Sequence, residues 1–102
     1  MKKIAGVVVM HAILCLSNPV SAGDAEAGKG KAAACVGCHG EAGISSNPLW
    51  PNLAGQQQGY IVKQLRAFRD GTRTDPMMSP IAMPLTDADI ENLAAYYNSL
   101  QQ

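Results

Sequence analysis

Apolar residues recur at helical spacing near the C-terminus of the chain. Thr86 to Asp89 resembles a helix-capping box with Asp in the place of Glu. The positions that follow it place apolar side chains along one side of a helix. This apolar face comprises Ile90, Leu93, Ala94, Tyr97 and Leu100. The pattern predicts a helix that follows Thr86 and buries this face.

A second helical pattern lies in the middle of the chain. Ile61, Leu65 and Phe68 stand at i, i+4 and i+7, and Gly71 follows as a typical helix stop. We therefore expect a helix from about residue 57 to residue 70.

A third pattern begins at Asp24. This residue can cap a helix that runs to about Ala34, because the segment is rich in alanine and Glu26 lies in its first turn. Gly28 lies inside it, where glycine costs about 1 kcal/mol relative to alanine, so either another element approaches closely or the glycine is simply tolerated. No alternating strand pattern competes with the three helices, and the sequence predicts an all-α fold.

Two loops rich in glycine and proline, residues 40–56 and 71–85, connect these helices. Such segments cannot satisfy all their own backbone hydrogen bonds, so in a small domain they need an organising partner. Their apolar side chains would lie against that partner or in an ordinary core. These side chains are Leu49, Trp50, Ile81 and Leu85.

The N-terminus has the layout of a secretory signal peptide. Lys2 and Lys3 precede an apolar run over residues 4–16, and Val20-Ser21-Ala22 is the small-residue pattern of a cleavage site. The run is shorter than the roughly 20 residues that span a bilayer. We expect cleavage of residues 1–22, which leaves residues 23–102 as one exported domain with no stable membrane insertion. An uncleaved anchor is the alternative.

The charge and size of residues 23–102 limit the partners that this segment can bind and the core that it can form. The whole chain carries eight Lys plus Arg and eight Asp plus Glu, and two of the cations lie in the leader, so the remainder has a net charge of about −2. This mildly acidic balance argues against nucleic acid as a partner. A domain of this size is also too small for a comfortable apolar core without a staple.

Residues 35–39 read Cys-Val-Gly-Cys-His, the C-x-x-C-H pattern of covalent haem attachment. Cys35 and Cys38 can form thioethers to the two vinyl groups of one haem, while His39 can place an imidazole nitrogen on the iron. A disulfide or a redox C-x-x-C has no use for the histidine, and a zinc site needs more ligands. We therefore expect one covalent haem c as the staple.

The second axial ligand separates electron transfer from chemistry on small molecules at the iron. The only other histidine, His11, lies in the leader, so a second histidine is not expected. Met77, Met78 and Met83 all fall in the second loop, where a distal ligand is required. Any one of them could bind iron, or all could fill gaps in the core.

Residues 23–102 resemble the class I cytochromes c, in particular the single-haem domains of the cytochrome c4 type and their one-domain relatives. The matching segments are residues 23–29, 35–40, 51–56, 71–73, 85–87 and 93–97, with Tyr60, Gln64, Leu65, Met78 and Ile81. The resemblance implies a small class I cytochrome c fold, with three main helices and loops wrapped around one haem. It also implies that Gly28 and Tyr97 form the contact where the first and last helices cross.

The same resemblance implies roles for individual residues. Counted back from Thr86, the family's methionine ligand falls at Met78. Pro51 resembles the proline whose carbonyl accepts a hydrogen bond from the far nitrogen of the histidine ligand. Arg73 resembles an arginine that lies near the haem propionates.

The expected function is that of a periplasmic carrier, not an enzyme, which moves single electrons between a respiratory dehydrogenase and a terminal oxidase or reductase. Docking would be transient, and the protein a monomer or weak homodimer. The best-known relatives hold two haem domains in one chain, whereas this chain has one C-x-x-C-H motif. A dedicated haem subunit of a periplasmic oxidoreductase complex is therefore one alternative. A gas sensor or catalyst with a labile sixth ligand is the other.

Overall fold

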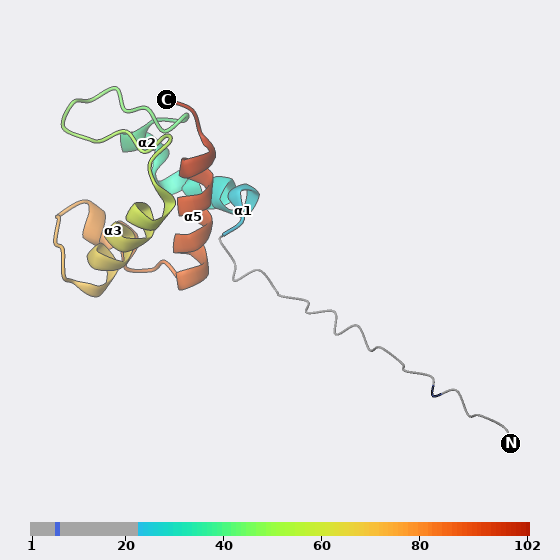
Figure 1. Cartoon of the computed structure of the whole chain (residues 1–102). Coiled ribbons are helices and arrows are strands. Elements are labelled where there is room, and N and C mark those ends of the chain that lie inside the picture. Colours follow the sequence, from blue (N-terminus) through green and yellow to red (C-terminus); the bar gives the residue numbers. More distant parts are fainter. Residues whose placement is uncertain (1–5, 7–22) are drawn as a thin grey trace, which may run out of the picture.

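The computed structural model describes residue 6 and residues 23–102 (Figure 1). The predicted signal peptide and His11 lie outside the described residues, apart from Gly6. Helices and turns make up residues 23–102, with no strand among them, which confirms the all-α fold. None of the helices in this part of the chain has the length and apolar character to span a membrane. The elements are α1 (Ala25–Lys31), η1 (Ala32–Ala34), α2 (Val36–His39), α3 (Gln58–Asp70), α4 (Met78–Ala82) and α5 (Asp87–Ser99).

Helix α5 is the centre of the fold, and α1 and α3 both pack against it (Figure 1). Its capping box is confirmed: the Thr86 side chain accepts from the Asp89 amide, and the Asp89 carboxylate accepts from the Thr86 amide, each at 3.0 Å. The predicted apolar face is buried, with Leu100 at its edge. Ile61 and Val62 of α3 join the same cluster.

Replacing Thr86 by Ala is expected to lower the free energy of unfolding by about 1 kcal/mol, because the Asp89 amide loses its capping partner. Denaturant unfolding of the Thr86→Ala variant measures the loss. Thr74→Ala, at an exposed threonine in the loop before α4, is the control and should have little effect. Equal losses in the two variants would show that the cap contributes nothing of its own.

The crossing of α1 and α5 is built on Gly28. A Cβ placed there would overlap the Asn92 carbonyl and lie 2.8 Å from the Tyr96 Cβ. The expectation that Tyr97 forms this contact is therefore corrected: Asn92 and Tyr96 are the nearest residues. Tyr97, about 100° further round α5 than Tyr96, is buried in the core cluster.

The predicted start of the first helix and the predicted end of the middle helix are both present. Asp24 accepts hydrogen bonds from the Glu26 and Ala27 amides, and α1 continues through η1 to Ala34. Helix α3 ends at Gly71, whose φ of 87° lies in the left-handed region that favours glycine. Arg69 of α3 donates to Asp87 of α5 at 2.7 Å, which lowers the pKa of that carboxyl and links the two helices at the surface.

The second predicted loop, residues 71–85, is not entirely loop. It contains the short helix α4, which the glycine- and proline-rich composition concealed. Asp75 precedes this helix, and its carboxylate accepts from the Met77 and Met78 amides. A helix of five residues is too short to be stable by propensity alone, so its capping contacts have to supply part of its stability.

Candidate haem-binding site

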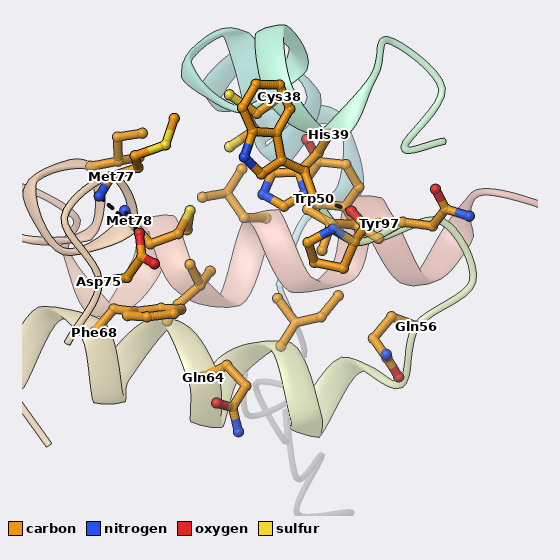
Figure 2. Close-up of a pocket in the computed structure, with 18 of the residues that line it drawn as sticks. Cys38, His39, Trp50, Gln56, Gln64, Phe68, Asp75, Met77, Met78 and Tyr97 are labelled. Carbon is orange, nitrogen blue, oxygen red and sulfur yellow. Dashed lines mark hydrogen bonds between the residues drawn. The ribbon is translucent and has the colours of Figure 1, made fainter. Parts of the chain in front are cut away.

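A cavity of about 480 Å³ opens between α2, α3, α4 and the loop that precedes α3 (Figure 2). All the site residues expected from the sequence line this cavity. They are Cys35, Cys38, His39, Pro51, Arg73 and Met78. The three helices and the two loops thus bring together residues up to 43 positions apart in the sequence.

The C-x-x-C-H motif forms a single helical turn. The His39 amide donates to the Cys35 carbonyl at 2.9 Å, and this turn places Cys35 and Cys38 on neighbouring positions of one face. Both cysteines are free and half-buried. The chain then turns sharply at Gly40, where φ is 86° and a Cβ would overlap the Ile44 carbonyl. Cys35 and Cys38, on one helical turn, thus both line the same cavity.

His39 is buried, with 6% of its surface exposed. Its Nδ1 lies 2.7 Å from the Pro51 carbonyl oxygen. Since a carbonyl can only accept, Nδ1 carries the proton in this hydrogen bond, and Nε2 keeps its lone pair. The arrangement fixes the ring and leaves one nitrogen available as a metal ligand.

Met77 and Met78 line the cavity on the side of α4, whereas His39 and Trp50 lie toward α2 (Figure 2). Met78 is half-buried and Met77 is 48% exposed. Met83 is 66% exposed and does not line the cavity. Two of the three candidate methionines thus reach the site.

The apolar loop residues divide between the cavity and the core. Leu49, Trp50 and Ile81 line the cavity. Leu85 does not line it and instead packs against the cluster around α5, which is the ordinary core packing that the sequence left open as the alternative. Leu85 immediately precedes the α5 cap, and its position at the base of that helix directs it toward the helical core.

Gln64, Asp75 and Tyr97 are among the polar residues that line the cavity but were not expected as site residues from the pattern alone. Gln64 accepts a hydrogen bond of 2.6 Å from the Arg73 guanidinium, which also lies 4.4 Å from the centre of the Phe68 ring. This pair of contacts holds Arg73 at the edge of the cavity. Asp75 accepts from the amides two and three residues later, as a helix-capping aspartate does. An aspartate just before a short helix is therefore the sequence signal that could have indicated this role.

The Tyr97 hydroxyl is buried and has no hydrogen-bond partner in the described part of the chain. Besides burial, the Cys35 thiol near this hydroxyl contributes to the raised pKa of Tyr97, but the two groups do not meet the geometric criteria of a hydrogen bond. Burial raises the pKa of both the Tyr97 phenol and the Cys35 thiol, which keeps the two groups neutral. An unpaired buried hydroxyl costs about 1–3 kcal/mol, so Tyr97 indicates that a further group belongs in the cavity.

The donors that face the cavity fit a covalently attached haem. Two thiols adjoin an imidazole with a free nitrogen, thioether sulfurs lie on the side of α4, and aromatic and aliphatic side chains form much of the wall. Arg73 lies at the edge and could offer a counter-charge to the carboxylates of a haem. Among the described residues no cluster of His, Cys, Asp and Glu offers a competing metal site.

Comparison with known proteins decides the family. The cytochrome c family pattern matches residues 25–101. The chain belongs to the cytochrome c family. Members of this family bind haem c through the C-x-x-C-H motif, and Cys35 and Cys38 occupy the two attachment positions of this cytochrome c.

Cytochrome c4 from Thiocapsa roseopersicina is 53% identical over 76 residues, which cover 74% of this chain and 39% of the relative. Cytochrome c-554(548) from Halomonas halodenitrificans is 46% identical over 81 residues, which cover 76% of this chain and 98% of the relative. The chain thus spans about two fifths of the cytochrome c4 and nearly the whole of the smaller protein.

The fold agrees with a solved structure of the same kind. Reduced recombinant cytochrome c4 from Pseudomonas stutzeri superposes with a TM-score of 0.74 at 42% identity, over 78% of this chain and 46% of the other. The chain is also similar to a protein that is not named a cytochrome c4, the thiosulfate dehydrogenase electron acceptor from Thiomonas intermedia. It is 44% identical over 73 residues, which cover 70% of this chain and 33% of that protein.

Proposed function

We propose that this cytochrome c is a periplasmic carrier of single electrons, with residues 23–102 forming one monohaem domain after removal of residues 1–22. The observation that carries the proposal is the cavity, which combines two thiols, a fixed imidazole and methionine side chains in a mostly apolar wall. Haem c supplies the reversible one-electron change between ferrous and ferric iron when it is bound there. The residues of the chain hold it and control its surroundings.

We assign His39 and Met78 as the axial ligands. The hydrogen bond from Nδ1 to the Pro51 carbonyl supports His39, since it directs Nε2 away from the protein backbone. Met78 is favoured over Met83 because it lines the cavity, and over Met77 because it is the more buried of the two. If both side chains bind the iron, they would leave no position on it for a substrate.

Arg73 has a separate role in this proposal. Its contacts with Gln64 and Phe68 fix a positive charge at the cavity edge, where it would stabilise the propionates. Trp50 and Ile81 add apolar surface to the cavity wall. A low local polarity disfavours the additional positive charge of the oxidised state.

Transient docking of redox partners is supported by the rim of the cavity. Leu49 is 84% exposed and Met77 is 48% exposed, and both line the cavity. Small apolar areas of this kind suit brief contacts between electron-transfer proteins. We propose a dehydrogenase as the donor and a terminal oxidase or reductase as the acceptor, with the protein as a monomer or weak homodimer.

A second candidate function is that of an electron-transfer subunit in a periplasmic oxidoreductase complex. The similarity to the thiosulfate dehydrogenase electron acceptor supports this assignment. The two proposals differ in association: a subunit remains bound to its enzyme through purification, whereas a carrier separates from it.

The protein matured with haem in the periplasm is expected to take up one electron per chain in a single reversible step, with slow binding of carbon monoxide to the reduced form. Spectroscopic redox titration and rapid mixing with carbon monoxide measure the two properties. Purification without a co-eluting enzyme supports the free carrier. Rapid binding of carbon monoxide would instead indicate an open sixth position and a sensor or catalyst.

A further inference from the structure

Asp75 makes an unusual set of contacts just before the two methionines of the cavity. A single carboxylate oxygen, Oδ1, accepts from the Met77 amide at 2.8 Å and from the Met78 amide at 2.9 Å (Figure 2). The Asp75 amide donates to the Ser79 hydroxyl at 2.9 Å, and the Ser79 amide donates to the Asp75 carbonyl at 3.0 Å. Four hydrogen bonds therefore lie within a five-residue segment: two join its ends, and two join its first residue to the methionine amides.

These bonds act on the backbone that carries Met78. Amides of Met77 and Met78 stand at the start of α4, where they have no partner within the helix. The two amide bonds, first that from Met78 and then that from Met77, lower the pKa of the Asp75 carboxyl. Bonds from amides to a carboxylate are stronger than neutral ones, so Asp75 holds the Met78 backbone more firmly than a turn alone would.

We infer that Asp75 is a positioning residue for the sixth ligand: its carboxylate fixes the backbone conformation of the methionine-bearing strap, residues 75–79, from which the Met78 side chain extends. The inference rests on the proposed His39 and Met78 ligation. For an external ligand to reach the sixth position, the Met78 side chain has to leave it, and the contacts of Asp75 with Met77 and Met78 oppose the change in backbone conformation that would release it. Asp75 itself lines the cavity, so the restraint acts directly beside the site.

The chain provides a matched control in Asp24. Its Oδ1 accepts from the amides two and three residues later, Glu26 at 2.9 Å and Ala27 at 3.4 Å, as Asp75 does at Met77 and Met78. Asp24 caps α1 and does not line the cavity. Replacing Asp24 by alanine therefore removes similar capping hydrogen bonds and leaves the strap unchanged.

The test measures binding of imidazole to the ferric holoprotein, together with hydrogen exchange of the Met77 and Met78 amides. Asp75→Ala is expected to tighten imidazole binding by about tenfold or more and to speed exchange at both amides. Asp75→Asn keeps an acceptor oxygen and should restore binding to within about threefold of the wild type. Ser79→Ala should change binding in the same direction as Asp75→Ala but by less, and Asp24→Ala should leave it unchanged.

Equal imidazole affinities in Asp75→Ala and the wild type would overturn the inference, as would equal increases in Asp75→Ala and Asp24→Ala. If Asp75→Ala fails to mature with haem, Ser79→Ala decides: an imidazole affinity equal to that of the wild type would overturn the inference. Failure of the proposed ligation looks different, because the ferric protein would then either lack the far-red band of sulfur bound to iron or keep that band in Met78→Ala. Either result would remove the basis for the Asp75 inference together with the ligation.

Discussion

Met78→Ala is expected to abolish the far-red sulfur-to-iron band of the ferric protein and to lower its reduction potential by about 0.1 V or more. A thioether ligand favours ferrous iron, so its replacement by water or another ligand stabilises the ferric state. The half-buried position of Met78 on the cavity wall leaves it well placed to serve as that ligand. Optical spectra of both redox states and a potentiometric titration measure the two effects.

Two matched variants isolate the effect of this one sulfur. Met83→Ala removes a methionine that is 66% exposed and lies outside the cavity, so it should change neither the band nor the potential. Met77→Ala removes the adjacent cavity methionine and should retain the band. A band that survives in Met78→Ala and disappears in Met77→Ala would transfer the assignment to Met77.

Gly28→Ala is expected to lower the free energy of unfolding of the holoprotein by about 2 kcal/mol or more. The added methyl group would overlap the Asn92 carbonyl and approach the Tyr96 Cβ to 2.8 Å. Backbone atoms on α5 cannot move aside as the end of a side chain can, so α1 and α5 have to separate. Denaturant unfolding of the ferric protein, followed by helical circular dichroism, measures the loss.

Gly30→Ala is the control on the same helix. A Cβ at Gly30 would meet nothing within 4 Å, and alanine gains about 1 kcal/mol of helix propensity over glycine. The two substitutions, identical in chemistry and two residues apart, should therefore change stability in opposite directions. A stable Gly28→Ala variant would mean that the close crossing of α1 and α5 is not needed for the fold.

The helices were predictable because their signals are local. Asp24, Gly71 and the box formed by Thr86 with Asp89 all act within one turn of a helix end, and the structure places each of them where the sequence indicates. Helix α4 was missed for the opposite reason. Its stability depends on Asp75 and Ser79 at the two ends of a proline-containing segment, where composition alone favours a loop.

Partners across the fold were harder to predict. Gly28 was expected to contact Tyr97, but the turn of α5 presents Asn92 and Tyr96 to it instead. For Leu85 the sequence left two places open, the cavity wall and an ordinary core, and the structure shows the second. Both cases concern the rotation or depth of an element, which apolar periodicity defines only to within a residue or two.

The sequence by itself determined the helical class, the attachment motif and the set of possible axial ligands, because each depends on residue types at short fixed spacings. Tertiary structure decided which of these residues meet. It placed the Pro51 carbonyl on His39 Nδ1, held Arg73 against Gln64 and Phe68, and left Met83 outside the cavity. These contacts depend on how α3, α4 and the loops pack around α5, and packing is a property of the whole domain that no short spacing encodes.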